Sequence, residues 1–166
     1  MTMLFEDVYI DASPAHVWNV IADLGGVVNY HPSVTASYYT SEAHTGTGAS
    51  RVCEFGGEFT IEETAVEWEE GESYTLSIAF VDGPKPPIDD IQGMLTVRPE
   101  KGGTRVGMRM TYKPRLGPVG ALMDRVMIRP RYEKMLPTIM VGLKHYIEQG
   151  EPVDGRLLKQ LQQAVA

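Results

Sequence analysis

The sequence has a single cysteine, Cys53, among its 166 residues, so it lacks the cysteine pairs that a disulfide framework or a cysteine-rich zinc site requires. Long apolar runs are also missing, because none approaches the roughly 18 residues that cross a bilayer. The first 50 residues contain no lysine or arginine, so the positive start of a signal peptide is absent. These absences exclude a disulfide scaffold and predict a protein without a membrane span, which we expect in the cytoplasm.

The motifs of several enzyme classes are missing as well. No His, Asp and Glu residues stand at metal-ligand spacing, and no serine or cysteine nucleophile motif is present. Gly46 and Gly48 lack the third glycine and the strand-to-helix context of a dinucleotide-binding loop. We therefore predict no metal and no cofactor, and hydrolase or nucleotide-dependent functions lose their support.

What is present is the composition of one globular domain, with 43% hydrophobic and 22% charged residues. The formal net charge of −7 is unevenly distributed: residues 1–97 hold 16 acidic and two basic side chains, whereas residues 98–166 hold 13 basic and six acidic ones. The basic residues alternate with apolar ones and do not form a block. We expect acidic strands packed around a basic helix, and no nucleic-acid binding, because net negative charge opposes a phosphate backbone.

The first two thirds of the chain show one strand pattern, then a short helical pattern, and then a long series of strand patterns. After a strand over residues 3–11, Ser13 and Pro14 provide a helix N-cap and a first helical residue, and apolar residues follow at helical spacing until Gly25. A second short turn is expected over residues 27–30. Apolar residues then alternate with period two between glycine-rich turns, which predicts an antiparallel meander. Its six strands are expected at residues 34–40, 49–55, 58–69, 73–80, 91–99 and 104–113.

The last third of the chain returns to helical spacing. Apolar residues recur every three to four positions, which predicts a short helix near residues 118–128 and a long one near residues 131–149. Pro130 and Pro137 each remove a backbone donor, so we expect each of them to break or kink the helix.

This order of elements predicts an α+β fold, with a strand, two short helices, a six-stranded meander and a long C-terminal helix. A strongly curved antiparallel sheet needs cover on its concave face, and the long terminal helix is the amphipathic element left to supply it. A sheet curved around a helix usually leaves a cavity. We expect one domain over residues 1–150, followed by a polar tail over residues 151–166 that holds a loose extra helix.

Five stretches of the sequence carry a resemblance to a known superfamily. They are residues 10–18 (IDASPAHVW), 30–34 (YHPSV), 46–51 (GTGASR), 63–70, and 142–148 (GLKHYIE). In their order and spacing, the chain resembles the START/Bet v1-like (SRPBCC) superfamily, and within it the bacterial polyketide cyclase/dehydrase-like group. The resemblance implies a helix-grip fold, in which a curved seven-stranded antiparallel sheet wraps around a long C-terminal helix, with two short helices after the first strand and an internal cavity for an apolar or amphipathic molecule. Members range from carriers and hormone receptors to ring-closing enzymes, so the resemblance specifies the fold better than the reaction.

Two loops bear on how such a cavity would be closed. Plant hormone receptors of the superfamily close their pocket with a longer loop between the third and fourth strands, where this chain has only Gly56 and Gly57. Hormone-receptor gating is therefore not expected. The longer loop here spans residues 81–89, contains three prolines, and could cover the pocket mouth.

Glu63 is the leading catalytic candidate. Period-two alternation puts Glu63 on the same strand face as Ile61 and Ala65, and on the opposite face from Trp68. The resemblance implies that the face of Glu63 points into the pocket, where a carboxyl group suits general acid or base work. Two alternatives stay open, a position on the solvent face or an ion pair with Arg51 on the preceding strand. Arg51 could instead bind a ligand carboxylate.

His31 and Tyr112 are the other catalytic candidates. His31 stands beside Pro32, where pockets of the superfamily open, and a histidine is the usual proton carrier near neutral pH. The alternative for His31 is a loop residue that fixes its neighbours. Tyr112 and Arg109 fall on opposite faces of the last strand, and the apolar neighbours share the face of Tyr112. We therefore expect the Tyr112 hydroxyl to point inward and orient a ligand.

The remaining candidates are side chains that would contact the ligand. Flexible thioethers on the last strand and the long helix suit an adaptable pocket, although ordinary core packing explains them as well. Trp18 is expected mainly in the core. The predicted ligand-binding residues are Arg51, Trp18, Ile61, Met108, Met110, Met135 and Ile139.

The sequence leaves two main functions open. The first is binding of a hydrophobic or amphipathic small molecule, a lipid, polyketide or aromatic compound, in an internal cavity, and the alternative is a cofactor-independent polyketide cyclase or dehydratase. Apolar cavity walls would favour the first, and convergent polar groups the second. We expect no stable membrane insertion, and a homodimer is compatible with the sequence. A third function, docking on a lipid surface in a way that salt would abolish, would use the basic residues Arg125, Arg129, Arg131 and Lys134.

Overall fold

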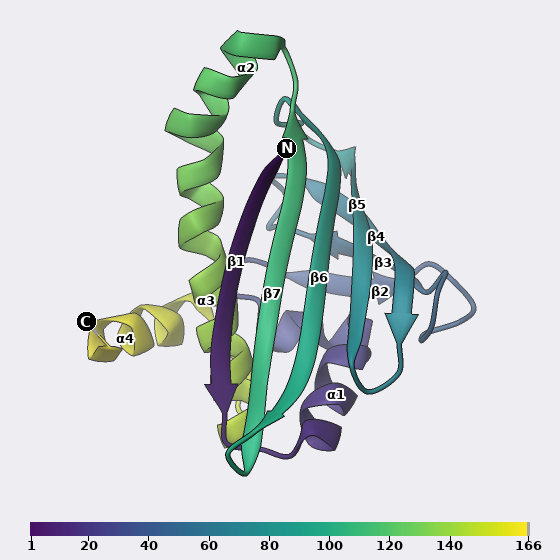
Figure 1. Ribbon diagram of the computed structural model, residues 1–166, viewed down its shortest axis with the longest axis vertical. Helices are drawn as coiled ribbons and strands as arrows, with labels where there is room; N and C mark the ends of the chain where they lie inside the picture. The colour runs from purple at the N-terminus through teal and green to yellow at the C-terminus, as the bar shows by residue number, and fades with distance from the viewer. Residues whose placement is uncertain (166) are drawn as a thin grey trace.

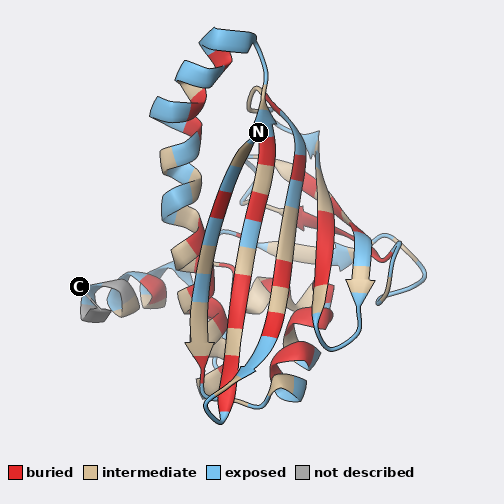
Figure 2. Ribbon diagram, in the orientation of Figure 1, coloured by how far each residue is buried: buried red, intermediate tan, exposed pale blue. Residues whose placement is uncertain are grey.

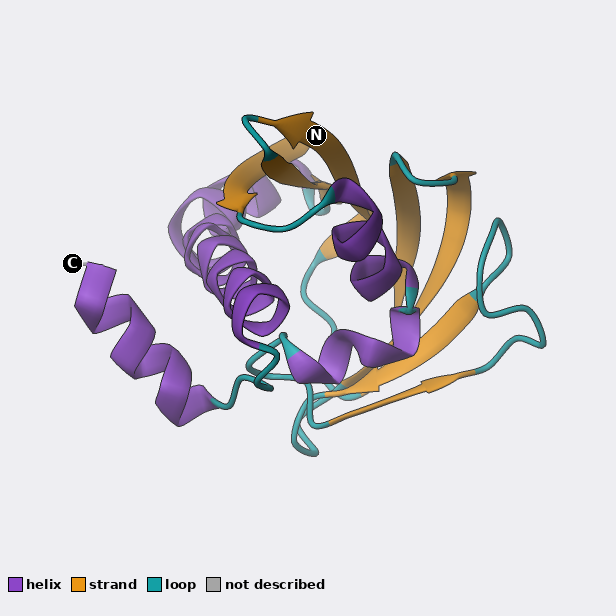
Figure 3. Ribbon diagram, turned by 90° about the horizontal axis from the view of Figure 1, so that it is seen from below, coloured by secondary structure: helices purple, strands orange, loops and turns teal. Residues whose placement is uncertain are grey.

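The computed structural model describes residues 1–165, which form one curved sheet with helices along its concave side (Figure 1). In Figure 3 the strands follow an arc, with α1 and α3 inside it. The elements are β1 (Thr2–Ile10), α1 (Pro14–Ala22), η1 (Leu24–Asn29), β2 (Ala36–Tyr39), β3 (Ser50–Glu54), β4 (Thr60–Glu69), β5 (Ser73–Asp82), β6 (Ile88–Glu100), β7 (Gly103–Pro114), α2 (Gly117–Met123), η2 (Asp124–Ile128), α3 (Arg129–Gln149) and α4 (Gly155–Val165).

The seven strands are antiparallel throughout and stand in the order β1-β7-β6-β5-β4-β3-β2. This confirms the expected curved antiparallel sheet. Strands β2 to β7 follow each other as a meander, whereas β1 and β2 lie at opposite edges. The chain crosses between those edges through α1 and the 3₁₀ helix η1. Helix α1 begins as the sequence predicts, with the Ser13 hydroxyl accepting the His16 backbone N–H at 3.2 Å and Pro14 in the first turn.

The long C-terminal helix has 33 residues, because α2, η2 and α3 run on without interruption (Figure 1). The expected break between two separate helices near Pro130 is therefore wrong, whereas a kink at Pro130 or Pro137 stays a prediction. Segment η2 is a π turn in which the Arg129 N–H donates to the Asp124 carbonyl, and Pro130 lies in the first turn after it. The regular hydrogen-bond ladder is already altered at this point, so a residue without an N–H is accommodated. Pro137 lies inside α3 and does not end it either.

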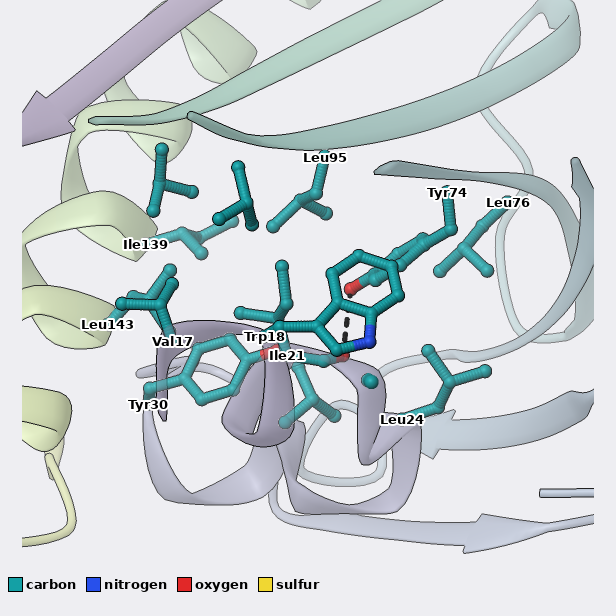
Figure 4. Close-up of a cluster of buried hydrophobic side chains, with 14 of the residues drawn as sticks. Val17, Trp18, Ile21, Leu24, Tyr30, Tyr74, Leu76, Leu95, Ile139 and Leu143 are labelled. Carbon is teal, nitrogen blue, oxygen red and sulfur yellow. Dashed lines mark hydrogen bonds between the residues drawn. The ribbon is translucent and has the colours of Figure 1, made fainter. Parts of the chain in front are cut away.

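The main core lies where α1 and the C-terminal half of α3 pack on the concave face of the sheet (Figures 2 and 4). Figure 4 shows Ile21 of α1 and Leu143 of α3 among these side chains, and both are fully buried. Gly142 sets the approach of α3, because a Cβ at this position would lie 2.2 Å from the Tyr30 carbonyl oxygen. A smaller cluster, which includes Leu136, lies toward the N-terminal half of α3. The helix is thus held closely at one end of the sheet, and the cavity lies toward its other end.

Strand β4 departs from strict alternation at a β-bulge. Ala65 pairs with Leu76 and Trp68 pairs with Tyr74, which leaves Val66 as the extra residue. Trp68 consequently turns to the same side as Tyr74, and their rings stack with centroids 5.3 Å apart. The expectation that Trp68 lies on the opposite face from Ala65 is therefore wrong, because one inserted residue reverses the alternation.

The chain beyond the long helix packs back on the fold. Gly150 ends α3 with a left-handed conformation, φ 73°, that glycine adopts without steric cost. The Val153 N–H then donates to the Asn29 carbonyl at 2.8 Å, and Leu158 of α4 is buried. Helix α4 is the extra helix expected in the tail, and residue 166 lies outside the described residues. Among residues 1–165, no helix is both long and apolar enough to cross a membrane.

Candidate functional site

A cavity of about 1180 Å³ lies between the concave face of the sheet and the helical run. Strands β3 to β7 contribute to its wall, together with η2, the N-terminal half of α3, and residues 30–34 after η1. The turn between β3 and β4 and the proline-rich loop between β5 and β6 complete the wall. That the second loop covers the mouth of the cavity stays a prediction. Small-molecule pockets in proteins usually measure about 300–1000 Å³. The cavity therefore has room for a large organic ligand.

Most of the cavity wall is apolar. Its aliphatic part includes Ile61 and Ile139, two of the predicted ligand contacts. Thioether side chains line the part nearest the helical run, where they can adjust to ligands of different shape. Five methionines belong to the wall: Met108, Met110, Met123, Met127 and Met135.

A row of three aromatic rings forms the wall near the β3–β4 turn. Phe55 and Phe59 stack with centroids 4.4 Å apart, and Phe80 lies 5.5 Å from Phe59. These three residues were not among the predicted ligand contacts, because two of them flank a glycine turn that was expected to be only a connection. Aromatic residues on both sides of Gly56 and Gly57 are the signal that would have identified them.

Arg51 and Glu63 form a buried ion pair in this apolar wall. They stand directly opposite each other on β3 and β4, and Arg51 Nε donates to Glu63 Oε2 at 2.6 Å. Their side chains are only 5% and 10% exposed. Arg51 Nη1 also donates to the Leu24 carbonyl. Both charged side chains line the cavity, so Glu63 points inward and the alternative of a solvent-facing Glu63 is excluded.

The charges of this pair offset each other. Burial alone would lower the pKa of Arg51, but the neighbouring Glu63 carboxylate holds that pKa above its usual value. Cys53 Sγ lies 3.5 Å from Glu63 Oε2 and donates to it. Burial raises the pKa of the Cys53 thiol to about 11, so the group stays a thiol at neutral pH. The cysteine therefore supports the carboxylate as a hydrogen-bond donor and has little nucleophilic thiolate.

His31 lines the cavity as a neutral imidazole. Burial lowers the pKa of His31 to about 4, so the ring is uncharged at pH 7. Its Nδ1 accepts the Ser33 backbone N–H at 3.2 Å, which assigns the remaining ring proton to Nε2. Among the side chains and backbone groups that the structure describes, the Nε2–H has no hydrogen-bond acceptor. The ring packs edge-on against Phe55, 5.6 Å between centroids. His31 thus offers one neutral donor in an aromatic setting.

Two tyrosines that were not among the predicted site residues, Tyr30 and Tyr74, also line the cavity. Burial is the main cause that raises the pKa of Tyr30 to about 12 and the pKa of Tyr74 well above its usual value. The Tyr74 hydroxyl donates to the Ile21 carbonyl at 3.1 Å (Figure 4). Both phenols are uncharged at neutral pH, so their polarity is that of a hydroxyl group. Tyr30 stands in the stretch YHPSV, directly before the selected His31, and that stretch is the signal that could have identified it.

Two predicted site residues are not part of the cavity wall. Trp18 belongs to the core, where its Nε1 donates to Glu70 Oε1 at 2.7 Å. Tyr112 is fully buried on the expected side of β7, but η2 covers it, and its hydroxyl donates to Asp124 Oδ1 at 2.6 Å. The side of the sheet was correct for Tyr112. The sequence did not indicate that a helical turn would take up its hydroxyl.

The cavity holds no arrangement of ligands for a metal ion. Within the described part of the chain, no three His, Cys, Asp or Glu side chains lie close enough together to bind one. The buried polar groups that a ligand would meet include His31, Tyr30, Cys53 and the Arg51–Glu63 pair, and the exposed basic side chains Lys85, Arg131 and Lys134 also line the cavity.

Known proteins resemble this chain in sequence and in fold. A sequence profile of the family described as polyketide cyclase/dehydrase and lipid transport matches residues 1–148. No curated protein sequence matches the chain. A protein from Thermobifida fusca solved by NMR has a TM-score of 0.70 and 22% identity, with 95% of each chain covered.

Two further solved structures extend this comparison. TTHA0849 from Thermus thermophilus has a TM-score of 0.66 and 22% identity, and the comparison covers 88% of this chain and 97% of the other. The Aha1 dimer from Colwellia psychrerythraea has a TM-score of 0.67 and 11% identity, with coverage of 90% and 98%. At these identities the likeness shows the fold alone, and it confirms the helix-grip fold. The profile match over residues 1–148 confirms the resemblance to the polyketide cyclase/dehydrase-like group.

Proposed function

The chain belongs to the polyketide cyclase/dehydrase and lipid transport family, and we propose that it binds a largely apolar small molecule with an uncharged polar group in its cavity. The observation that carries the proposal is the composition of the cavity wall. Aliphatic, aromatic and thioether side chains surround a few polar groups, and the only buried charges there, Arg51 and Glu63, are paired with each other within the described chain. Apolar walls with few polar groups are typical of ligand sites that gain affinity from hydrophobic burial. Lipids, polyketides and aromatic compounds meet these requirements.

In the buried part of the cavity around Arg51 and Glu63, an uncharged polar group fits better than a carboxylate. Arg51 already donates to Glu63 and to the Leu24 carbonyl. A carboxylate placed next to this buried pair would have to displace Glu63 or bring a second negative charge beside it, and an unpaired charge is costly to bury. His31 Nε2–H is a neutral donor suited to a carbonyl or hydroxyl oxygen. The ligand is therefore expected to carry a ketone, ester, enol or alcohol.

A second candidate function is a cofactor-independent cyclase or dehydratase in the same cavity. The observation in its favour is that His31, Tyr30 and Glu63 all line the cavity and could contact one ligand. The state of these groups favours binding without turnover. A histidine whose pKa is about 4 is a weak base at neutral pH, and Glu63 is engaged with Arg51. Catalytic roles for Glu63, His31 and Tyr112 stay predictions.

Displacement of a neutral apolar dye tests the proposal. The protein is titrated with 1-aminoanthracene, and the dye is then displaced by decanol, methyl decanoate or sodium decanoate. We expect decanol and the ester to displace the dye at lower concentration than decanoate. Mass spectrometry of molecules that copurify with the folded protein gives an independent identification. If no compound binds below millimolar concentration, the proposal is wrong. If decanoate displaces the dye at lower concentration than decanol and the ester, the ligand does not carry an uncharged polar group.

A cavity-filling variant with a matched control locates the binding. Met108 lines the cavity, whereas Met94 on the neighbouring strand contacts Arg109 on the other side of the sheet. Met108→Trp should weaken dye binding by about tenfold or more because it removes ligand volume, and Met94→Trp should leave the affinity unchanged. Equal effects of the two substitutions would place the bound dye outside the cavity.

A further inference from the structure

The helical segment next to the cavity mouth exposes an unusual number of apolar side chains. In Figure 2 this end of the helical run is coloured mostly as exposed. The segment spans residues 116–127, and we call it the α2–η2 surface. Its large apolar side chains are each 63% to 66% exposed: Leu116, Val119, Leu122, Val126 and Met127. Single exposed apolar residues are ordinary on a protein surface, but five within three helical turns form a patch that calls for a partner.

Basic side chains accompany this patch. Arg125, Arg131 and Lys134 are exposed, and none of them has an acidic partner among residues 1–165. Arg129 is paired with Glu133 at 2.8 Å. The patch is therefore positive toward solvent, although the whole chain has a formal net charge of −7. A locally positive, apolar surface on an acidic protein selects for a negatively charged partner.

The acidic residue inside this segment does not weaken that charge at the surface. Asp124 is buried and accepts hydrogen bonds from Tyr112 and Thr2. Its carboxylate faces the interior of the fold, whereas Arg125 beside it is exposed.

The α2–η2 surface is continuous with the cavity mouth. Met127, Arg131 and Lys134 are exposed and also line the cavity. Lys85, in the loop between β5 and β6, is exposed and lines the cavity as well. A partner that covers the patch would therefore also cover the opening through which a ligand enters.

We propose that the α2–η2 surface docks on an anionic phospholipid bilayer, with the cavity mouth turned toward the lipid. A helix with interleaved apolar and basic side chains lies in the plane of the interface, where its apolar residues enter the acyl boundary and its basic residues meet anionic headgroups. A second copy of the chain is a poorer partner for this face, because two such surfaces would bring arginines against arginines. Docking on the bilayer does not require that the cavity bind a ligand. Exchange of a ligand between the cavity and the bilayer would require it, and that part rests on the proposed function.

Vesicle flotation of the full chain tests the docking. The protein is mixed with vesicles of phosphatidylcholine alone, or of phosphatidylcholine with phosphatidylglycerol. We expect it to float with the anionic vesicles, to stay behind with the neutral ones, and to be released as sodium chloride is added. Equal flotation with both vesicle types, or no flotation with either, would overturn the proposal.

Substitutions that leave the cavity wall intact assign the surface. The double variant Leu122→Ser and Val126→Ser should lower the vesicle partition coefficient about tenfold or more, and Arg125→Gln about fivefold. The matched controls are Phe5→Ser on β1, which is 61% exposed, and the exposed Arg98→Gln on β6. Both controls should bind like the parent protein. If the controls weaken binding as much as the test variants, docking does not use this surface.

Two parallel measurements separate this inference from the proposed function. None of the three substituted residues of the α2–η2 surface lines the cavity. The 1-aminoanthracene affinity should therefore be unchanged in the variants, whatever the vesicles show. Size-exclusion chromatography over a range of concentrations is the second measurement. A dimer that the double variant dissociates would show that a second copy covers the patch, and would overturn docking on a bilayer.

Discussion

Tyr112 and Asp124 join the end of the sheet to the helix that borders the cavity mouth. The Tyr112 hydroxyl donates to Asp124 Oδ1 at 2.6 Å, and Thr2 Oγ1 donates to the other carboxylate oxygen at 2.7 Å. Asp124 is the first residue of η2, so these bonds hold the π turn against β1 and β7. Farther along the same helical run, Gly142 makes its close contact with the Tyr30 carbonyl oxygen. The cavity lies between two fixed points.

Tyr112→Phe tests this anchor. The substitution keeps the ring but leaves a buried carboxylate without one of its two donors, which should lower the free energy of unfolding by about 1–3 kcal/mol. Urea denaturation followed by fluorescence measures the change. Tyr132→Phe is the control, because the Tyr132 ring packs near Tyr112 at 5.6 Å while its hydroxyl has no hydrogen bond to Asp124. An equal loss in both variants would show that the hydroxyl is not the source of the stability.

Glu63→Gln tests the buried ion pair. The substitution leaves the Arg51 guanidinium without its counter-charge in an apolar wall, so we expect the free energy of unfolding to fall by about 3–5 kcal/mol. The double variant Arg51→Met and Glu63→Leu removes both charges and should recover most of that loss. Urea denaturation of the single and double variants completes the cycle. Losses that simply add would mean that the two charges do not interact.

Because His31 is buried as a neutral ring, we expect the free energy of unfolding to depend on pH. Burial lowers the pKa of His31 from 6.5 to about 4, so the unfolded chain takes up a proton at a higher pH than the folded one. The contribution of the neutral His31 to the free energy of unfolding is therefore fully present above pH 6.5 and is lost as the pH falls through about 4. The total loss is about 3 kcal/mol. His31→Phe should remove this part of the pH dependence. The free energy of unfolding is compared between the two proteins at pH 7 and pH 5, and parallel curves would contradict the prediction.

Gly142→Ala tests the contact that sets the position of α3. The new Cβ would meet the Tyr30 carbonyl oxygen at 2.2 Å, and a backbone atom cannot turn aside as a side chain does. We expect a loss of about 1–3 kcal/mol and a lower melting temperature. Gly155→Ala is the matched control, because nothing lies within 4 Å of its Cβ and alanine favours a helix. A melting temperature unchanged by Gly142→Ala would show that α3 shifts without cost.

Local sequence patterns were sufficient for the order and type of the elements. Ser13 and Pro14 mark the start of α1 because capping is decided within one helical turn. Period two in the middle of the chain predicts the meander, because side chains on a strand alternate whatever lies above them. The inward side of Glu63 and its pairing with Arg51 follow from the same rule, as register and a short turn place them opposite each other.

Only the tertiary structure decided which inward-facing groups reach the cavity. Alternation assigns Tyr112 to the concave face, but the π turn at Asp124 covers it and takes its hydroxyl, through a contact 12 residues away in the chain. Trp68 changes side because one extra residue at Val66 reverses the alternation, and nothing in the local pattern marks a bulge. Pro130 stays inside a helical run because a π turn precedes it, and the local sequence pattern did not predict that turn. The spacing of apolar residues indicates which side of a strand or helix a side chain faces. Whether that side chain reaches the cavity depends on which element, distant in the sequence, packs over it.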